Sequence, residues 1–221
     1  MNDQWTYLVA TCLLFTAAAC GGGTGPGNGG GSGSAPAIGE NLVESPDAEG
    51  EDPTSGWIQT GCLTATSYGE GDGPDASSKG PSDRGDAYFS GRGVACKDTV
   101  GAAQWIEHVS DLRESGVAGD VPYNFEVRGY LGGWGGDPDH ATFSAYFLNQ
   151  DDRLIQAATL GPVSETDRGG TSQLLERSVS EDVPDGTDRI MLLLEFRRFG
   201  TGQHKGVADN LSFTLTEKND S

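Results

Sequence analysis

The stretch Ala141-Thr-Phe-Ser-Ala-Tyr-Phe147 gives the clearest indication of the fold class, because small or aromatic apolar residues occupy every second position in it. Successive side chains of an extended chain point to opposite faces. One face therefore carries Ala141, Phe143, Ala145 and Phe147, and the other carries Thr142, Ser144 and Tyr146. An amphipathic helix would instead need apolar residues three and four positions apart. The stretch predicts a β-strand with one buried face.

The same alternation recurs on both sides of this stretch, and turn residues separate the segments. Residues 149–153 predict a turn, after which residues 154–160 are expected to pair with the first strand. The other inward-facing sets are Phe125, Val127 and Leu131; Ile190, Leu192, Leu194 and Phe196; and Leu211, Phe213 and Leu215. Residues 110–116 are compatible with one helical turn, which Ser110 could cap. This pattern predicts an all-β fold, an antiparallel β-sandwich of the jelly-roll type.

The N-terminus has the composition of a sorting signal. Residues 7–19 are apolar, too short to span a bilayer, and end in small residues, so residues 1–19 are expected to be a signal peptide. Ala17-Ala18-Ala19-Cys20 resembles the lipobox of bacterial lipoproteins, in which the cysteine is lipidated after cleavage. The alternative is an ordinary cleaved signal with Cys20 incidental. Lipidation implies an extracytoplasmic protein that is anchored in the cell envelope.

A tether is expected at residues 20–37, which are nearly all Gly, Ser, Pro and Ala after Cys20. Such a chain cannot bury apolar surface, and it would reach roughly 20–25 Å as a flexible coil. The β-sandwich is then expected to occupy residues 38–221, with a short acidic tail at its C-terminus.

The charge of the chain excludes several classes of partner. It has 33 acidic and 14 basic residues among 221, giving a net charge of −19. Nucleic-acid binding requires clustered Lys and Arg, so no nucleic-acid partner is expected. Electrostatic docking on anionic lipid is equally disfavoured, and membrane contact is expected through the lipid anchor only.

Cysteine usage is consistent with export. Of four cysteines, Cys12 lies in the signal and Cys20 at the lipobox, which leaves Cys62 and Cys96. Two thiols in an exported domain are expected to form one disulfide, which would contribute ~3–4 kcal/mol in the chain-entropy model. A zinc site is the alternative, but no His or third Cys lies at ligand spacing.

Four segments, in order, resemble the galactose-binding-like jelly rolls, a group that includes discoidin-type domains and carbohydrate-binding modules. They are Asn41-Leu-Val with Asp47-Ala-Glu49 and Gly56-Trp57; Asp83-Arg-Gly85 with Tyr88-Phe-Ser-Gly91; Gly129-Tyr-Leu-Gly-Gly-Trp134; and Val183-Pro-Asp-Gly-Thr187 with Ala208-Asp-Asn-Leu-Ser212. The resemblance implies that the first and last strands meet beside a structural calcium. Asp47, Glu49 and Asp209 would be its ligands, since Ca²⁺ takes six to eight oxygens at about 2.3–2.6 Å. The alternative is that these acids are turn and cap residues.

Aromatic residues are the candidates for ligand contact, because sugar rings stack on such surfaces while polar neighbours bind hydroxyl groups. Trp134, with two glycines on each side, is the candidate for an exposed platform. Tyr130 and Arg128 share the polar face of the same strand. The alternative for Trp134 is a loop plug packed on the end of the sandwich, whereas Trp57 and Trp105 are expected in the core.

A binding module for carbohydrate or another envelope component is the function that the sequence favours. No nucleophile elbow or zinc-binding His-Glu-x-x-His occurs, so an enzyme is not expected. Two alternatives stay open: a calcium-stabilised structural or adhesion domain that binds a protein, and a glycosidase-type enzyme whose carboxylate pair sequence spacing cannot identify.

Overall fold

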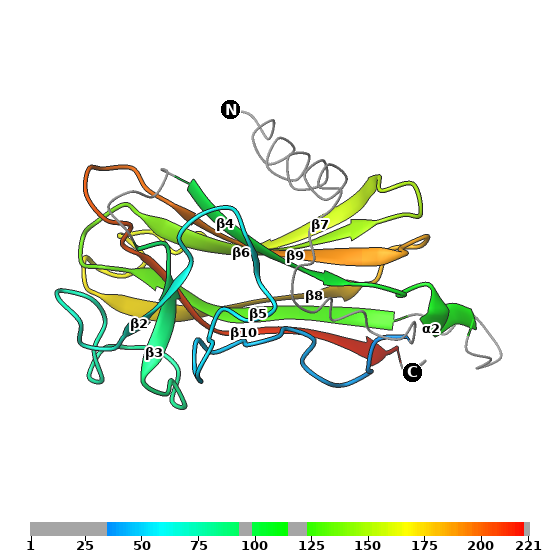
Figure 1. Ribbon diagram of the computed structural model, residues 1–221, viewed down its shortest axis with the longest axis horizontal. Helices are drawn as coiled ribbons and strands as arrows, with labels where there is room; N and C mark the ends of the chain where they lie inside the picture. The colour runs from blue at the N-terminus through cyan, green and yellow to red at the C-terminus, as the bar shows by residue number, and fades with distance from the viewer. Residues whose placement is uncertain (1–34, 93–98, 115–122, 219–221) are drawn as a thin grey trace, which may run out of the picture. The chain divides into compact units, whose positions relative to one another are not determined.

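The computed structural model describes residues 35–92, 99–114 and 123–218, which all belong to one unit, Gly33–Ser221. Within these residues the strands form two five-stranded sheets, and every printed strand pair is antiparallel (Figure 1). This arrangement confirms the predicted antiparallel β-sandwich.

Sheet I contains the strand that was predicted at residues 141–147. Its order is β1 (Ile58–Gln59), β4 (Thr99–Ile106), β9 (Arg189–Arg197), β6 (His140–Leu148) and β7 (Leu154–Leu160). The predicted hairpin of β6 and β7 is confirmed, since Phe143 lies opposite Leu160. In the turn between them, the Asn149 side chain accepts hydrogen bonds from the backbone amides of Asp151 and Arg153.

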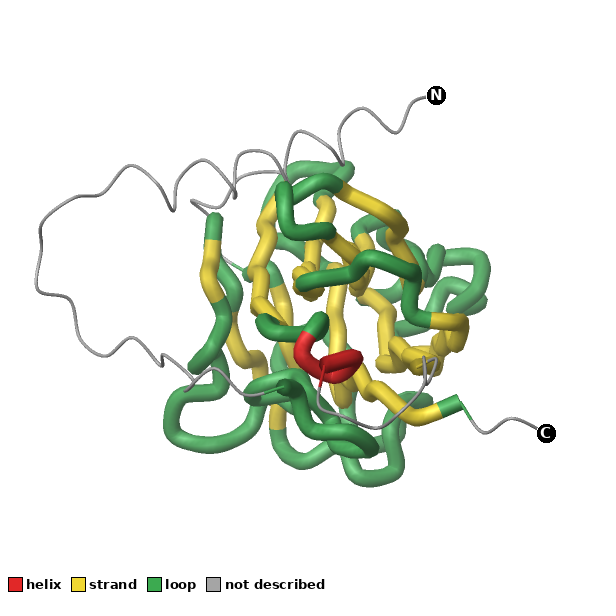
Figure 2. The backbone as a smooth tube through the Cα atoms, turned by 90° about the vertical axis from the view of Figure 1, so that its right-hand side faces the viewer, coloured by secondary structure: helices red, strands yellow, loops and turns green. Residues whose placement is uncertain are grey.

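Sheet II packs against sheet I and contains the last strand of the chain. Its order is β2 (Thr64–Ser67), β3 (Ala87–Ser90), β10 (Gly206–Glu217), β5 (Tyr123–Gly133) and β8 (Gln173–Asp182). Most neighbours in space are therefore distant in sequence, as in a jelly roll. The short helix α2 (Asp111–Glu114) lies at the end of the sandwich that faces the viewer in Figure 2.

The core between the sheets consists of the residues that the alternation predicted to point inward. The four apolar residues of the stretch 141–147 are fully buried. The ring of Phe125 lies 4.6 Å from that of Phe147 and 6.1 Å from that of Phe213, so aromatic residues of β5, β6 and β10 meet at its centre. Each fully buried side chain of this size contributes about 1.5–3 kcal/mol through the hydrophobic effect.

Two expectations from the sequence were wrong in detail. Trp57 is buried in the core, but Trp105 is only half-buried and lies under the guanidinium of Arg189 at 5.4 Å. Ser110 donates to Oδ1 of Asp188 at 2.9 Å, an interaction outside the helix that it was expected to cap. Among the residues that the structure describes, no helix is long and apolar enough to cross a membrane.

The first described segment runs along the last strand, as the resemblance implied. The Asn41 side chain donates to the carbonyl of Leu211 at 3.0 Å and accepts from the amide of Phe213 at 3.1 Å. The amide of Leu211 in turn donates to the carbonyl of Pro46 at 2.8 Å. These bonds place residues 41–47 along the edge of β10 that does not pair with β5, where they form one wall of the site described next.

Candidate functional site

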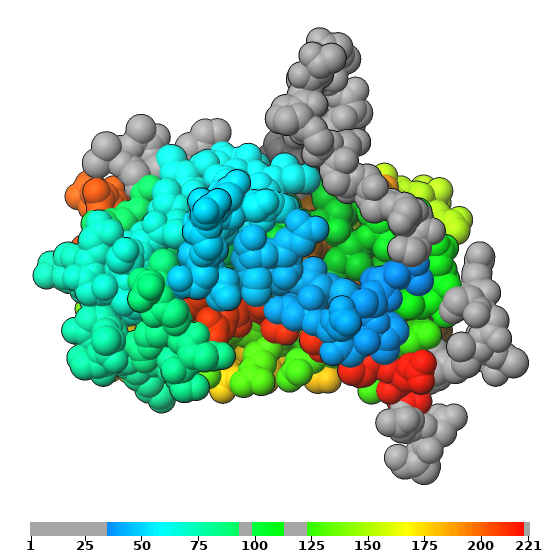
Figure 3. All heavy atoms as spheres, turned by 60° about the horizontal axis from the view of Figure 1, so that its bottom comes forward, coloured from blue at the N-terminus to red at the C-terminus, as the bar shows by residue number. Residues whose placement is uncertain are grey.

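The outer face of sheet II is polar along its central strands. On β5 the outward residues are Glu126, Arg128 and Tyr130, of which the first two are exposed and Tyr130 is half-buried. Ser212 of β10 lies opposite Arg128, and Asp209 lies opposite Tyr130. Figure 3 shows β10 (red) and β5 (green) at the surface between the first described segment (blue) and the loops that follow β2. Such a floor offers hydrogen-bonding groups around one aromatic ring.

A cavity of about 590 Å³ lies on this floor. Its lining includes Arg128 and Tyr130, two of the three ligand-binding residues predicted from the sequence. The other lining residues come from the segment beside β10, the loop before β3, and the two central strands: Asn41, Pro46, Asp47, Ser82, Asp83, Glu126, Asn210, Leu211, Ser212 and Thr214. Oxygen and nitrogen atoms therefore surround most of the cavity.

A β-bulge shapes the wall of this cavity. The register of β10 against β5 shifts between Asp209 and Ser212, and Asn210 in the bulge has a positive φ of 46°. Asparagine tolerates this left-handed conformation better than most residues. Bulges occur often beside functional sites because they redirect a side chain, and here the Asn210 side chain donates to Oδ1 of Asp83 at 2.9 Å.

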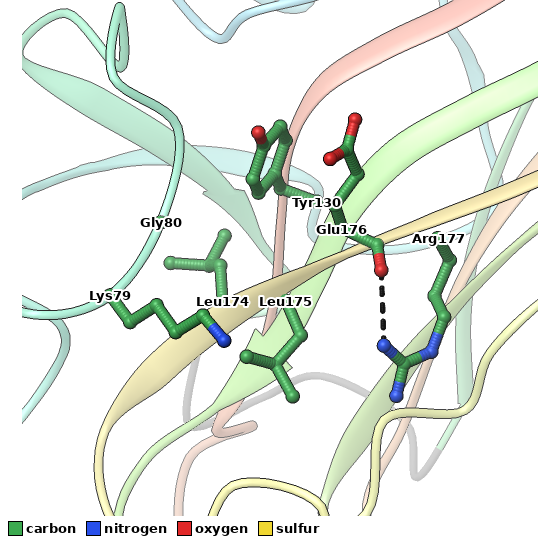
Figure 4. A pocket seen from close by; sticks show the side chains of 7 residues that line it. All are labelled: Lys79, Gly80, Tyr130, Leu174, Leu175, Glu176 and Arg177. Atoms are coloured by element: carbon green, nitrogen blue, oxygen red, sulfur yellow. Dashed lines mark hydrogen bonds between the residues drawn. The ribbon is translucent and has the colours of Figure 1, made fainter.

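A second cavity, of about 300 Å³, adjoins the same tyrosine. Figure 4 shows its lining: Lys79, Gly80, Tyr130, Leu174, Leu175, Glu176 and Arg177. Tyr130 lines both cavities, so its ring lies between them. The two cavities over β10, β5 and β8 share this residue, and we call them together the Tyr130 groove.

The loop that walls the groove is held in place by several hydrogen bonds. Arg84 donates to the carbonyls of Pro81, Asp75 and Ser78 at 3.1, 2.8 and 2.8 Å. The amide of Leu174 in β8 donates to the carbonyl of Lys79 at 2.9 Å. A wall that is ordered before binding lowers the entropic cost of association.

One ion pair crosses the floor of the groove. The Arg128 guanidinium contacts the carboxylate of Glu176, which points outward from the neighbouring strand β8. Both side chains are roughly half exposed. The hydrogen bond and charge of Glu176 raise the pKa of Arg128. Because both groups remain accessible to water, the pair is available to bind hydroxyl groups of a ligand.

Trp134 does not lie in the groove. Its ring is half-buried, the Arg92 guanidinium covers it at 4.9 Å, and it packs against a small cluster of Tyr88, Leu174 and Val207. An exposed stacking platform would have an open face, so the geometry favours the alternative of a loop plug. The glycines around Trp134 predicted the loop, but not what the ring packs against.

Of the three predicted calcium ligands, Asp209 is fully buried, and Asp47 and Glu49 lie close enough for their charges to act on it. Burial raises the pKa of Asp209 to about 7, the charges of Asp47 and Glu49 add to the rise, and hydrogen bonds from Tyr68 and Asn210 oppose it. Oε1 of Glu49 accepts from the amides of Asp86 and Ala87, each at 2.7 Å. The three acids thus share one region of negative charge.

The chemistry of this region suits a hard cation. Oδ1 of Asn210 is buried and has no hydrogen-bond partner among the described residues. Such an oxygen beside carboxylates is the kind of ligand that Ca²⁺ takes. In the part of the chain that the structure describes, however, no group of three or more His, Cys, Asp or Glu side chains is arranged to hold a metal ion. Calcium at Asp47, Glu49 and Asp209 therefore stays a prediction.

Several predicted features fall outside the described residues. These are the signal at residues 1–19, Cys20 with most of its tether, and Cys96. Cys62 is partly buried against the core. The lipid anchor and the pairing of Cys62 with Cys96 stay predictions.

Comparisons with known proteins give structural likeness only. No protein family and no curated protein matches the sequence. Among solved structures, the chain is similar to the enzymatically active domain of tailspike protein 4 of bacteriophage CBA120, with 16% identity and a TM-score of 0.48 over 79% of this chain and 21% of that one. It thus spans about a fifth of the tailspike chain.

Two smaller neighbours are matched over almost their whole length. The CBM22-1 xylan-binding domain of Paenibacillus barcinonensis Xyn10C has 14% identity and a TM-score of 0.43, over 84% of this chain and 100% of that one. A family 16 carbohydrate-binding module has 16% identity and a TM-score of 0.43, over 79% and 99%. With TM-scores below 0.5, neither likeness carries an argument about this chain.

Sequence reasoning missed half of the groove. Lys79, Glu176 and Arg177 were not singled out. Lys79 lies in a loop, and β8 is an edge strand whose outward residues are mostly polar and whose inward residues are only partly buried. In the sequence, Leu175 and Val179 alternate with the polar residues Glu176, Ser178 and Ser180, and this signal could have identified the strand.

Proposed function

We propose that the domain binds carbohydrate and that the saccharide lies in the Tyr130 groove. The observation that carries this proposal is the position of Tyr130, a half-buried aromatic ring between two cavities with hydrogen-bonding walls. An aromatic ring can stack on the apolar face of a pyranose, and surrounding polar groups can bind its hydroxyls. Arg128, Glu126 and Ser212 supply such groups beside the ring.

The shape of the groove suits a chain of sugars. Cavities of about 590 and 300 Å³ lie on either side of one ring, so units before and after the stacked sugar each have a place. The rim of the groove is mostly polar, and polar side chains can form hydrogen bonds with a ligand that is rich in hydroxyl groups.

Binding of the full chain to immobilised polysaccharides tests this proposal. We expect selective retention on some polymers of the panel, and loss of retention in the Tyr130→Ala variant. If the chain binds no polysaccharide, while its melting curve shows a folded domain, carbohydrate binding is contradicted. Retention that Tyr130→Ala leaves unchanged would place the ligand elsewhere on the domain.

We also propose that the protein is exported and anchored in the cell envelope through Cys20. The supporting observations are the apolar run of residues 7–19, the lipobox-like Ala17-Ala18-Ala19-Cys20 and the glycine-rich tether that follows. In a bacterial host, labelled fatty acid should be incorporated into the parent and not into Cys20→Ser, which should leave the membrane fraction. Equal labelling of both would contradict the anchor.

Calcium is proposed as a structural ion held by Asp47, Glu49 and Asp209. Its role would be to neutralise the buried carboxylate and to fix the segment of residues 41–49 against β10. The support is the shared negative charge and the buried, unpartnered Oδ1 of Asn210. The test of calcium is independent of the saccharide and is given in the Discussion.

A further inference from the structure

We infer that the saccharide in the Tyr130 groove is an extended, uncharged polysaccharide that lies lengthwise along β5. Tyr130 contacts it near one end of this path, and Glu126 of β5 and Thr214 of β10 contact it at the other end. This inference rests on the proposed carbohydrate function and goes beyond it by naming the class of polymer and the direction in which it is bound. It follows from the wall, the floor and the charge of the larger cavity.

A wall that runs parallel to β10 sets the direction of the larger cavity. The amide of Gly39 donates to the carbonyl of Leu215 at 2.8 Å, and the carbonyl of Pro46 accepts from the amide of Leu211 at 2.8 Å. Residues 39–46 therefore follow β10 in the antiparallel direction, and members of this segment line the cavity. None of the lining residues of this cavity belongs to β8. The larger cavity is thus walled on its β10 side, and its long direction is that of the strands.

The floor along this direction consists of polar side chains that a ligand can reach. Two rows of such residues cross the three strands next to Tyr130: Ser178, Arg128 and Ser212, then Ser180, Glu126 and Thr214. All six are exposed or half-buried, and each can form hydrogen bonds with sugar hydroxyls. From Tyr130 to Glu126 the strand measures about 14 Å at about 3.4 Å per residue, which is the length of roughly two to three pyranose units.

The path cannot continue along β5 in the opposite direction. The next outward position after Tyr130 is Gly132, which lies between Leu174 and Val207 in the register of the sheet. Both of these side chains are fully buried, in the cluster against which Trp134 packs. The smaller cavity leaves room for one further unit beside Tyr130 on the β8 side. With the length of the floor, the groove therefore accommodates roughly three to four units.

The charge of the larger cavity disfavours an acidic polymer. Asp47, Asp83 and Glu126 line it, and its one cation, Arg128, contacts the carboxylate of Glu176. These acids repel a carboxylate or sulfate on a ligand, whereas uncharged hydroxyl groups can donate hydrogen bonds to them. The net charge of −19 adds to the repulsion at longer range. An uncharged chain is therefore the class of polymer that suits this path.

Oligosaccharides of increasing length test the path. Calorimetric titration of the full chain would use the cello-, xylo- and manno-oligosaccharide series from one to six units, together with the polymer of each series. For the series that binds, we expect the affinity to rise about tenfold or more from the disaccharide to the tetrasaccharide and to change less than about twofold beyond it. A monosaccharide that binds as tightly as the tetrasaccharide, or an affinity that keeps rising up to six units, would overturn the inference.

Variants distinguish the far end of the path from Tyr130. Thr214→Val removes one hydroxyl with little change of shape, and it should weaken tetrasaccharide binding about threefold or more but disaccharide binding less than about twofold. Thr142→Val is the matched control, because Thr142 is also half-buried but lies on the outer face of sheet I. Tyr130→Ala should instead weaken the binding of every length. Equal effects of Thr214→Val and Thr142→Val on the tetrasaccharide would contradict the path along β5.

The preference for an uncharged chain is tested with one polymer in three forms. The polymer that binds is compared with its carboxymethyl ether and, as a control for size, with its hydroxyethyl ether. At low ionic strength the carboxymethyl ether should bind about tenfold or more weakly than the hydroxyethyl ether, and rising salt should reduce this difference because it screens exposed charges. Equal or tighter binding of the carboxymethyl ether would overturn the uncharged ligand.

The outcomes separate this inference from the proposed function. Binding that does not depend on length, or retention of the parent on charged polysaccharides only, overturns the inference and leaves carbohydrate binding intact. Failure of the parent to bind any oligosaccharide or polysaccharide, uncharged or charged, overturns the inference together with the proposed function.

Discussion

The hydroxyl of Tyr68 donates a hydrogen bond of 2.6 Å to Oδ2 of Asp209, a carboxyl group that is fully buried in β10. Tyr68 belongs to the loop after β2, and Asp209 belongs to the last strand, so the bond joins that loop to sheet II. Burial, and the charge of Asp209, raise the pKa of Tyr68 well above its ordinary value. The phenol of Tyr68 therefore keeps its proton, and the carboxyl group of Asp209 accepts the hydrogen bond.

The pKa of Asp209 predicts how stability depends on pH when calcium is absent. The folded pKa is about 7, against an ordinary value of 3.8. Between these values the native chain holds a proton that the unfolded chain has released, so the free energy of unfolding should fall as the pH rises from about 4 to 7. The decrease from this group is at most about 4 kcal/mol, at about 1.4 kcal/mol for each unit between the two pKa values.

Urea unfolding at pH 4, 5.5, 7 and 8 in chelator measures this dependence. Asp209→Asn, which keeps an oxygen for Tyr68 but cannot titrate, should lack the decrease. Taking the difference between parent and variant removes the contribution of other groups. A difference that does not change with pH would show that Asp209 titrates near its ordinary pKa.

Calcium should stabilise the native state, and more strongly at pH 8 than at pH 5, because a carboxylate must be deprotonated to bind it. A cation that binds only the folded chain contributes about 2.7 kcal/mol at one hundred times its Kd. Calorimetric melting with calcium and with chelator measures this effect. Asp47→Asn should reduce the shift in Tm, and a Tm that chelator leaves unchanged in the parent would rule out the site.

Tyr130→Ala should weaken saccharide binding about tenfold, which corresponds to about 1.4 kcal/mol. The loss reflects the removed stacking surface, and Tm should stay the same because the ring is only half-buried. Phe199→Ala is the matched control, since this ring is 56% exposed and lines neither cavity. Equal losses in the two variants would contradict a specific role for Tyr130.

Arg168 should be one of the most sensitive positions for stability. Its guanidinium is almost fully buried and donates to the carbonyls of Val163, Gly135 and Asp137 at 2.8, 3.2 and 2.7 Å. Arg168→Met leaves these acceptors without their donor, at about 1–3 kcal/mol for each unsatisfied group. We expect a loss of about 3 kcal/mol or more in denaturant unfolding, against less than about 0.5 kcal/mol for a surface substitution such as Arg153→Met.

The predicted disulfide between Cys62 and Cys96 can be tested by mass. In the exported protein, alkylation without reductant should leave both cysteines unmodified, and alkylation after reduction should modify both. Reduction should also lower stability by about 3–4 kcal/mol, because the unfolded chain regains conformational freedom. Modification of both thiols before reduction would contradict the pairing.

Tyr130 and Trp134 show what a local sequence pattern can predict about the position of a side chain. The alternation along β5 predicts that Tyr130 and Arg128 share the outward face, and the structure places both there; their contact with a ligand stays a prediction. Trp134 follows the same strand, but its exposure depends on Arg92, which lies more than 40 residues earlier in the sequence and covers the ring. No local pattern contains that information.

The amino-acid pattern alone predicted the strands of the core and which of their faces is buried, because the two-residue period of an extended chain is a local property. It therefore predicted the β6–β7 hairpin, the inward residues of β9 and β10, and the class of the fold. The groove, in contrast, depends on contacts between segments that are distant in the sequence. The pairing of β5 with β8, and of β8 with the loop at Lys79, joins segments far apart in the chain. Tyr130 of β5 lines a cavity with residues of β8 and of the loop at Lys79, and these nonlocal contacts leave no periodic signal in any of the three segments.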